Sequence, residues 1–450
     1  MMRHILLAGT CAVSLAMIAA CDDIAEFSPT ADSGQPSTRP ARGKSLHGHE
    51  REDDKSEAID ASPSTPSIPS TPSIPFTPLV KPQAHGPASP DPKGLVLTTF
   101  NLENFNDEDV RQGGSGLIHH KRDAAGLRRL AEAIKKVNPD IMAVQEIILR
   151  HPRKDAAAFR DFVTTHVNPL THREYEVAFF DERSLPAFWT VSAKGGGRID
   201  PRSLIEHTVA FIYDPARVAI VGSHDRQTIF AYEPPDGDGW PSTYWAFGNY
   251  RLNWATFETL QAPAFRFVVM NVHLKGGAGL NNARARLDQI KYIQTHILPA
   301  AKVSLGGPPI ENTVILGDMN TVEYGGDFPT VPPSRATPTY DDSFRKLGVE
   351  DVSKELKCTS YWDPGVEYFN TAKAHDADAK HPNYVPSFLD HILVSDEMLK
   401  HFVPKAAWVT SNCAEFACRP VPKKPEVAAF MANWRDVSDH CPVSVWLQRK

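Results

Sequence analysis

Short polar signatures lie at the ends of apolar, strand-like runs throughout the chain beyond residue 95. They are Asn101-Leu102-Glu103-Asn104, Gln145-Glu146, Asn271-Val272-His273, Gly317-Asp318-Met319-Asn320 and Ser438-Asp439-His440. Strand ends that carry such groups place them along one edge of a sheet, where ligands commonly bind. Carboxylates bind a hard cation, histidines transfer protons and amides hold phosphate oxygens. The pattern therefore indicates metal-dependent cleavage of a phosphoester.

Two residues are suited to this chemistry by their types alone. Glu146 ends a strand-like run, and an ionised carboxylate held there is a hard oxygen ligand for Mg²⁺. His440 offers an imidazole with a pKa near neutrality, as a base that removes a proton from attacking water needs. A solvated glutamate and a structural histidine are the simpler alternatives. Asn271 lies two residues before His273 and shares its face of the strand, so it joins the same edge or anchors a neighbouring loop.

The elements that must position these residues alternate between strands and helices. Amphipathic helices are expected over residues 123–137 and 283–298. Strands are expected over 140–144, 209–213, 313–316, 389–394 and 443–447. This alternation predicts a layered α/β domain. Stretches rich in Gly, Pro and Trp are predicted to form long surface loops over 185–204, 231–249 and 322–340.

Length and charge limit what the chain can be. Its 450 residues would allow two or three average domains, but residues 22–90 are rich in Ser, Pro and Thr and poor in large apolar side chains. The net charge of −6 and the pI of about 6.3 argue against a broad basic face that binds nucleic acid by charge alone. A local basic groove is compatible with these values. The edge of such a groove could be formed by the basic cluster His119, His120, Lys121 and Arg122. The alternative is that this cluster simply begins a helix.

The N-terminus has the pattern of an export signal. Residues 1–20 combine a short positive start with an apolar stretch too short to span a bilayer. The stretch ends in Ile18-Ala19-Ala20-Cys21, which resembles the lipobox of bacterial lipoproteins and implies a lipid on Cys21; an ordinary secretory signal is the alternative. We predict a signal peptide over 1–20, the lipidated Cys21 with a disordered tether over 21–90, and a catalytic domain over 91–450. The protein is then an exported lipoprotein of the cell envelope.

Four cysteines remain beyond the signal and the lipidated position, namely Cys358, Cys413, Cys418 and Cys441. An even number in an exported protein predicts two disulfides, for which three pairings are possible. We favour Cys413–Cys418, which closes a small local loop, together with Cys358–Cys441. A zinc site is not expected, because CxxC spacing is absent.

Taken in order, the motifs resemble the endonuclease/exonuclease/phosphatase superfamily, which includes pancreatic-type deoxyribonucleases, abasic-site repair nucleases, neutral sphingomyelinases and inositol polyphosphate phosphatases. A sixth motif, Leu389-Asp390-His391-Ile392-Leu393, strengthens the resemblance, which extends from about residue 95 to the C-terminus. The resemblance implies a four-layer α/β sandwich, with two mixed β-sheets packed face to face and helices outside. It also implies metal ligands. Glu146 would bind a catalytic Mg²⁺, and Asp439 would be a second metal ligand. Asn101 would orient the metal or a phosphate oxygen, and Glu103 could have the same role.

The resemblance implies catalytic roles as well. His440 would be the general base, and Asp390 would hold its imidazole in one tautomer and stabilise the charged form. Asp318 would orient the water or protonate the leaving oxygen, and Asn320 would bind phosphate. His273 would bind the scissile phosphate or act as general acid. Pancreatic-type deoxyribonucleases have a histidine at that position.

These expectations lead to a Mg²⁺-dependent phosphodiesterase, with Mn²⁺ or Ca²⁺ as other possible ions. The leading hypothesis is a monomeric nuclease that cleaves DNA or RNA outside the cytoplasm, without a protein partner. The alternative within enzymes is a sphingomyelinase-like phospholipid or sugar-phosphate hydrolase, although the sequence has no long apolar loop for docking on bilayers. A third hypothesis is a surface-anchored binding protein on an inactive scaffold. The substrate is less defined than the chemistry, because residues 206–210 lack the Arg or Tyr phosphate contact usual in the nucleases.

Overall fold

Helix α1 (Ala124–Val137) forms where the sequence predicted a helix, and its ends show why. The side chain of Asp123 accepts a hydrogen bond from the backbone N–H of Gly126 at 2.7 Å and so caps the first turn. Asn138 adopts a left-handed conformation that ends the helix. Between these ends the helix buries an apolar stripe that includes Leu130 and Ile134.

The computed structural model describes eleven segments of the chain, all within one unit that spans Phe76–Lys450. The segments are 94–105, 122–148, 152–179, 207–221, 230–232, 252–277, 280–303, 308–321, 340–362, 383–422 and 437–450. The predicted signal peptide, the predicted lipid on Cys21 and the predicted tether lie outside the described residues. None of the helices within these segments is long and apolar enough to cross a membrane.

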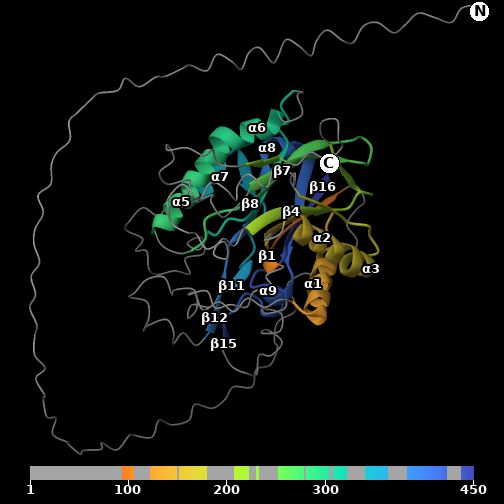
Figure 1. Ribbon diagram of the computed structural model, residues 1–450. Helices are drawn as coiled ribbons and strands as arrows, with labels where there is room; N and C mark the ends of the chain where they lie inside the picture. The colour runs from red at the N-terminus through yellow and green to blue at the C-terminus, as the bar shows by residue number, and fades with distance from the viewer. Residues whose placement is uncertain are drawn as a thin grey trace, which may run out of the picture. The chain divides into compact units, whose positions relative to one another are not determined.

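Two large mixed sheets carry the fold (Figure 1). The first, sheet A, has six strands, of which only β1 and β2 are parallel neighbours. In spatial order they are β14 (Phe402–Val409), β16 (Val443–Arg449), β1 (Leu95–Phe105), β2 (Ile141–Ile148), β4 (His207–Tyr213) and β3 (Glu176–Ala178).

The second, sheet B, has seven strands, of which only β8 and β9 are parallel neighbours. They are β10 (Val349–Asp351), β13 (Asp390–Ser395), β9 (Thr313–Asp318), β8 (Arg266–His273), β7 (Leu252–Thr259) and β5 (Val218–Ile220), with β6 (Phe230–Tyr232) also paired to β7. A small sheet C contains β11 (Ser360–Trp362), β12 (Asn383–Ser387) and β15 (Val421–Pro422).

The two large sheets pack face to face. Phe211 of sheet A meets Phe257 of sheet B edge-on, with ring centroids 5.6 Å apart. Along β8, Phe267 and Val269 join the core between the sheets, whereas residues 268 and 270 join the core on the helix side. The same alternation turns Asn271 and His273 toward sheet A, as the period of a strand requires.

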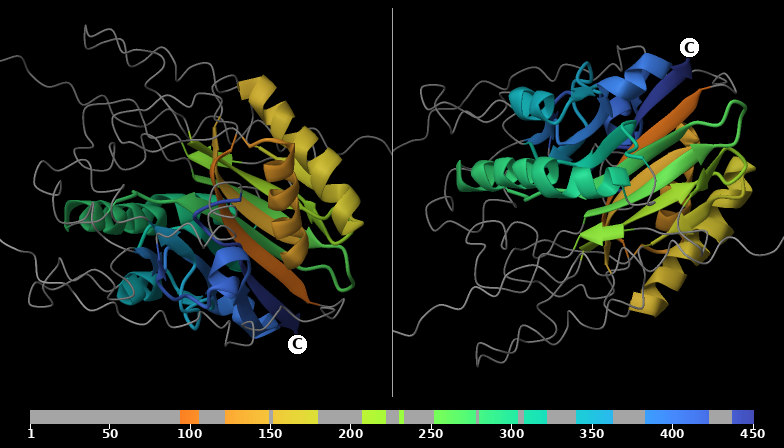
Figure 2. Two further views of the ribbon diagram at one scale, coloured as in Figure 1. Left: turned by 90° about the horizontal axis from the view of Figure 1, so that it is seen from below. Right: turned by 90° about the horizontal axis from the view of Figure 1, so that it is seen from above.

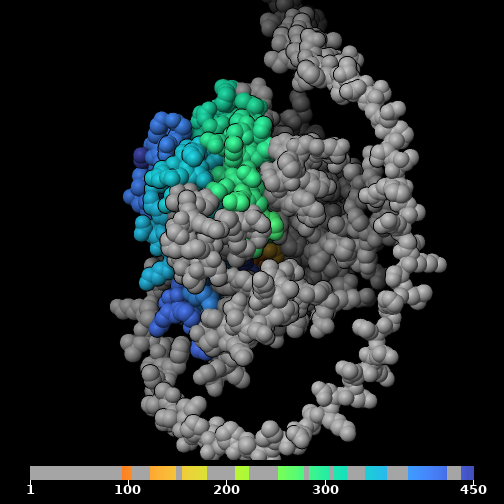
Figure 3. Space-filling view, turned by 90° about the vertical axis from the view of Figure 1, so that its left-hand side faces the viewer, coloured from red at the N-terminus to blue at the C-terminus, as the bar shows by residue number. Residues whose placement is uncertain are grey.

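Helices cover the outer faces of both sheets, on opposite sides in Figure 2. On the side of sheet A lie α1 and a continuous run of α2 (Pro152–Phe162), η1 (Val163–Val167) and α3 (Asn168–Thr171). On the side of sheet B lie α5 (Leu280–Tyr292), η4 (Ile293–Ile297), α6 (Leu298–Val303) and α7 (Tyr340–Lys346). The green helices α5 and α6 form outer surface in the space-filling view (Figure 3). Short helices α8 (Asp396–His401) and α9 (Ser411–Glu415) flank β14. This arrangement confirms the predicted fold class.

The structure extends several predicted elements. The helix expected over 283–298 continues through a π-helical turn, η4, to Val303. The loop expected over 185–204 lies outside the described residues, as do most of the other two. Residues 231 and 232, predicted as loop, instead belong to β6 because they pair with β7, and Tyr340 begins α7.

The favoured disulfide pairing was wrong. The structure joins Cys358 to Cys418 and Cys413 to Cys441, and leaves none of the four cysteines reduced. Cys413 lies in α9 and Cys418 follows the end of this helix, so the two side chains point to different neighbours although they are close in sequence. Closeness along the chain therefore did not decide the pairing.

Candidate active site

Strand register places three predicted site residues side by side in sheet B. His273 at the end of β8 pairs with Asp318 at the end of β9, and Asp318 pairs with Asp390 at the start of β13. Gly317 allows β8 and β9 to approach, because its φ is +153° and a Cβ atom there would lie 1.8 Å from the carbonyl oxygen of Val272. The Gly-Asp signature is thus required by backbone packing as well as by chemistry.

A β-bulge aims Glu146 out of sheet A. Two residues of β2, Gln145 and Glu146, oppose one residue of β4, because the register shifts between Val144 and Ile147. Glu146 has a left-handed backbone with φ +57°, and Glu103 on the neighbouring β1 has φ +44°. Non-glycine residues held in this region concentrate at functional sites. The Gln-Glu signature therefore marks an irregularity of the strand, which periodicity alone does not reveal.

Buried amides join the two sheets below this edge. The Nδ2 atom of Asn271 donates to the carbonyl oxygens of Val144 at 3.1 Å and Ala210 at 2.9 Å, and its Oδ1 accepts from Nε2 of Gln145 at 2.8 Å. Both amides are fully buried. Asn271 therefore joins the two sheets and is not part of the candidate site, so of the two sequence-based alternatives the anchoring one is nearer to the structure.

Asp318 is the centre of the candidate site. Its Oδ2 accepts hydrogen bonds from Nδ2 of Asn101 at 3.0 Å and Nδ2 of Asn320 at 3.1 Å. The Nε2 atom of His273 lies 3.4 Å from the same oxygen and 3.7 Å from Oε1 of Glu146. Asn101 also donates to Oε1 of Glu146 at 3.0 Å. The two sheets thus contribute jointly to one polar cluster.

His440 and Asp390 form the predicted pair. Nδ1 of His440 lies 2.8 Å from Oδ2 of Asp390, which is fully buried, and Nε2 points to the cluster, 3.7 Å from Oδ2 of Asp318 and 4.0 Å from Oδ1 of Asp439. Burial alone would lower the pKa of His440. The carboxylates of Asp390, Asp318 and Asp439 outweigh it and hold this pKa well above its ordinary value.

The turn that carries His440 is fastened to β1. The Ser438 hydroxyl donates to the carbonyl oxygen of Asn101 at 2.8 Å and accepts from the backbone N–H of His440 at 3.0 Å. The backbone N–H of Asp439 donates to Oε2 of Glu103 at 3.0 Å. The Ser-Asp-His signature thus contains both the imidazole of His440 and the Ser438 hydroxyl that fixes the backbone of His440 to β1.

Arg122 links the same two segments, a role that the sequence did not reveal. Its Nη2 atom donates to the carbonyl oxygens of Leu102 at 2.5 Å and Val437 at 2.7 Å. Burial lowers the pKa of its guanidinium, and the nearby carboxylates of Glu103 and Asp439 oppose that shift. Arg122 therefore stabilises the site by joining the backbone of β1 to the segment before His440. The sequence had suggested instead that it contacts substrate at the edge of a basic groove, or that it simply begins a helix. His119, His120 and Lys121 lie outside the described residues.

The acidic side chains fit a hard divalent cation. Burial, together with neighbouring carboxylates, raises the pKa of Asp318 to about 7 and that of Asp439 to about 6, and holds the pKa of Glu103 well above its usual range. Glu146 adds a further carboxylate, which interacts with all three. Buried and partly buried carboxylates that repel one another form a donor set whose negative charge Mg²⁺, Mn²⁺ or Ca²⁺ would compensate.

The loop after β8 is held rigidly. Arg286 is fully buried and donates through Nη1 to the carbonyl oxygens of Lys275 at 2.7 Å and Gly277 at 2.9 Å, and the backbone N–H of Lys275 donates to Oε1 of Gln289 at 2.8 Å. Burial, and then the charge of Arg286, lower the pKa of Lys275. These contacts fix the backbone of Lys275, which follows His273 by two residues.

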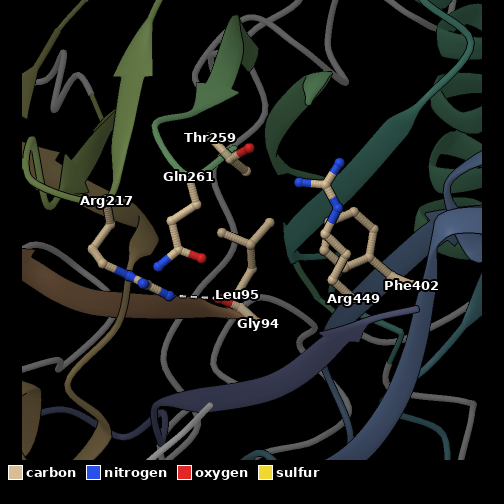
Figure 4. Close-up of a pocket in the computed structure, with 7 residues that line it drawn as sticks. All are labelled: Gly94, Leu95, Arg217, Thr259, Gln261, Phe402 and Arg449. Carbon is tan, nitrogen blue, oxygen red and sulfur yellow. Dashed lines mark hydrogen bonds between the residues drawn. The ribbon is translucent and has the colours of Figure 1, made fainter. Parts of the chain in front are cut away.

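A small cleft at the opposite end of β1 is not part of this site (Figure 4). It is lined by Gly94, Leu95, Arg217, Thr259, Gln261, Phe402 and Arg449. Leu95 and Asn101 are six steps apart on one strand, which separates the cleft from the site by roughly 20 Å. The arginines there serve the fold, because Arg217 donates to the carbonyl oxygen of Gly94 and Arg449 to that of Pro263.

All eight residues predicted for the site therefore meet in one cluster, in which each lies within 4.0 Å of at least one other. They are Asn101, Glu146, His273, Asp318, Asn320, Asp390, Asp439 and His440. The structure adds Arg122 and Ser438 as supports, and it places Glu103, for which a role at the metal or phosphate was considered, as the acceptor of the Asp439 N–H. The individual roles of these residues stay predictions.

Several solved structures are similar to the chain. An endonuclease/exonuclease/phosphatase family protein from Bacteroides thetaiotaomicron shares 19% identity, covering 80% of this chain and 98% of that one, with a TM-score of 0.41. The human Nocturnin catalytic domain with bound sulfate shares 13%, covering 80% and 97%, with a TM-score of 0.40. TDP2 of D. rerio, complexed with a single-strand DNA product, shares 13%, covering 79% and 98%, with a TM-score of 0.39. No curated protein matches the chain.

A family profile matches a much larger part of the chain than any one motif. The profile of the Endonuclease/Exonuclease/phosphatase family covers residues 98–440, which is more than half of the 450 residues. The match begins within β1 and ends at His440, so it contains all eight residues of the cluster. The chain therefore belongs to the endonuclease/exonuclease/phosphatase family, whose members are hydrolases that act on phosphoester bonds.

Proposed function

We propose that this protein is a divalent-cation-dependent phosphodiesterase that cleaves nucleic acid outside the cytoplasm. The observation that carries the proposal is the position of Asp318, whose Oδ2 atom lies 3.7 Å from Nε2 of His440 and 3.0 Å from Nδ2 of Asn101. Asn101 in turn donates to Glu146. The proposed base and the proposed cation ligands therefore flank one carboxylate, an arrangement suited to metal-assisted hydrolysis of a phosphodiester.

Glu146 and Asp439 would hold the cation, with Asn101 orienting Glu146. When bound, the cation supplies positive charge to the phosphate oxygens as negative charge develops on them. The Asn101 amide group faces the carboxylates with its nitrogen, and its Oδ1 accepts from the backbone N–H of Glu103 at 2.9 Å. Asn101 is therefore proposed to align the ligands, and its oxygen serves the turn of β1.

His440 would remove a proton from the attacking water. In the neutral ring Nδ1 faces Asp390, so Nε2 is the atom that accepts the proton, and the Asp390 carboxylate stabilises the imidazolium that forms. Asp318, with a pKa of about 7, can hold a proton at neutral pH and give it to the leaving oxygen. His273 lies between Asp318 and Glu146, where its Nε2 can donate to a phosphate oxygen.

Two features support a nuclease that acts outside the cytoplasm. His273 occupies the position at which pancreatic-type deoxyribonucleases, in the resemblance given above, carry a histidine. Both disulfides form among the four described cysteines, which suits an oxidising compartment and the export signal proposed for residues 1–20 with a lipid on Cys21. We therefore propose a monomer that is tethered to the cell envelope and cleaves DNA or RNA.

The test uses the purified full-length protein with its disulfides intact. Supercoiled plasmid and RNA are incubated with it in Mg²⁺ or in EDTA, beside His440→Ala and the matched control His401→Ala, which changes an exposed histidine on α8. Cutting that requires Mg²⁺, is lost in His440→Ala and persists in His401→Ala supports the proposal.

Two other outcomes would contradict it. Hydrolysis of a phosphocholine lipid by protein that leaves both nucleic acids intact would replace the substrate with a phospholipid. Failure to bind Mg²⁺ or Mn²⁺ in a calorimetric titration, with the fold intact, would indicate a binding protein on an inactive scaffold.

A further inference from the structure

Thr359 lies beside the catalytic pair but in none of the motifs. It sits between the disulfide-bonded Cys358 and the first residue of β11, and it is fully buried. Its segment belongs to the small sheet C, which sequence patterns did not connect to the site. The hydrogen bonds of Thr359 nevertheless reach Asp390 itself and Cys441, the residue that directly follows His440.

The Thr359 hydroxyl fixes the backbone of Asp390. Its Oγ1 atom accepts hydrogen bonds from the backbone N–H groups of Leu389 at 2.8 Å and Asp390 at 2.9 Å. The backbone N–H of Thr359 donates to the carbonyl oxygen of Ser387 at 2.8 Å, just upstream on the same segment. One buried residue therefore holds the backbone at the start of β13, from which the Asp390 side chain extends.

The same segment also fixes the backbone around His440. The carbonyl oxygen of Thr359 accepts from the backbone N–H of Cys441 at 2.8 Å, and the backbone N–H of Tyr361 donates to the carbonyl oxygen of Asp439 at 2.8 Å. Between them, Ser360 forms an isolated antiparallel bridge with His440. His440 is thus paired with the residue that directly follows Thr359.

No sheet ladder among the described strands performs this task. Asp390 begins β13 in sheet B, and His440 precedes β16 in sheet A, which are not paired with each other. Disulfides anchor both ends of the link, because Cys358 precedes Thr359 and Cys441 follows His440. The backbone N–H of Cys418 donates to the carbonyl oxygen of Cys413 at 3.1 Å, which joins the two disulfides through α9.

We infer that Thr359 is a positioning residue for the Asp390–His440 pair, and this inference rests on the proposed function. Its hydroxyl fixes the backbone position of Asp390, and its carbonyl oxygen fixes the backbone next to His440. The 2.8 Å contact between the side chains of Asp390 and His440 therefore depends on Thr359. Thr359 does not touch the reacting atoms. Its effect is to hold the base and the carboxylate in register across two sheets.

Two substitutions separate positioning from general stability. Thr359→Val keeps the shape but removes the acceptor, so the N–H groups of Leu389 and Asp390 lose their partner and the start of β13 moves. Thr359→Ser keeps the oxygen. In the full-length protein with Mg²⁺ we expect Thr359→Val to lower kcat roughly 10- to 100-fold, because a displacement of about 1 Å in a reacting group costs that much. KM should stay near its wild-type value, and Thr359→Ser should restore most of kcat.

A second measurement does not need catalysis. The proton shared between Nδ1 of His440 and Asp390 should give a far-downfield proton NMR signal, which His440→Gln identifies by removing it. We expect this signal to disappear or move in Thr359→Val and to remain in Thr359→Ser. If wild-type protein cleaves no phosphodiester, the proposed function fails, and the NMR result still decides the inference about Thr359.

Unchanged kcat together with an unchanged NMR signal in folded Thr359→Val would overturn the inference. So would equal losses in Thr359→Val and Thr359→Ser, because the retained oxygen would then be without effect. If Thr359→Val does not fold, Thr359→Ala replaces it in both measurements with the same expected and contradicting results.

Discussion

Replacing Asp390 with asparagine tests the proposed base directly. The Asp390 carboxylate is fully buried, and its Oδ2 lies 2.8 Å from Nδ1 of His440. The substituted asparagine would keep the shape, but its amide nitrogen would donate to Nδ1 and leave the proton of the neutral ring on Nε2. That is the atom that faces Asp318 at 3.7 Å and must accept the proton of the water. Asp390→Asn therefore removes the base without removing the imidazole.

The expected size of the effect follows from the geometry. A unit positive charge on the imidazolium, 2.8 Å from a carboxylate at an effective dielectric constant of about 20, is stabilised by at most about 6 kcal/mol. Each 1.36 kcal/mol is about a factor of ten in rate, so this limit corresponds to roughly four orders of magnitude. The asparagine retains part of the interaction, so we expect kcat to fall about 10³-fold, within the range known for a positioned general base.

Steady-state hydrolysis with Mg²⁺ measures this effect. KM and the affinity for Mn²⁺ should change little, because neither Oδ atom of Asp390 is proposed to contact substrate or metal. Asp396→Asn is the matched control and should leave kcat unchanged. Asp396 is an exposed acid that begins α8, after the end of β13 that lies away from Asp390. A loss of less than tenfold in folded Asp390→Asn would refute the assignment of His440 and Asp390 as the base and its partner.

Three further predictions address the metal, the disulfides and pH. Glu146→Gln should weaken Mn²⁺ binding at least tenfold in a calorimetric titration, because it removes an anionic ligand; unchanged affinity would exclude Glu146 from the metal site. Cys413→Ala/Cys441→Ala should lower the free energy of unfolding by roughly 3 to 4 kcal/mol in urea, because the lost crosslink joins residues 28 apart, and a loss under 1 kcal/mol would contradict this estimate. In metal-free protein the free energy of unfolding should fall as pH rises from about 4 to about 7. Asp318, with a folded pKa of about 7, keeps a proton there that the unfolded chain has lost. Asp318→Asn should flatten this slope in thermal unfolding, and an unchanged slope would assign the protons to other groups.

The clustering of the candidate site residues could be predicted because local signals and strand geometry agree there. Asp318 and His273 each follow an apolar run, and the parallel register of β8 and β9 brings strand ends together. The boundaries of α1 were equally accessible, because Asp123 and Asn138 are typical capping residues. In each case a short stretch of sequence contains both the signal and its physical cause.

Other features depend on contacts between distant segments, which no local pattern encodes. Arg122 looks like one member of a basic cluster, yet its partners are carbonyl oxygens near residues 102 and 437. Asn271 resembles its neighbour His273 in position, but it meets the backbone of sheet A and is used for packing. The disulfide pairing failed for the same reason, because the directions of the Cys413 and Cys418 side chains depend on what α9 packs against.

Asp318 connects the metal side of the site to its base side. Burial, Asp390 and Glu146 together raise its pKa to about 7, against the opposing effect of His440. A cation near Glu146 would lower this pKa, so Asp318 would give up its proton more readily. In the proposed mechanism, metal binding and the protonation of Asp318 would thus be thermodynamically linked. Cation affinity should consequently rise with pH, because protons leave the cluster as the cation enters.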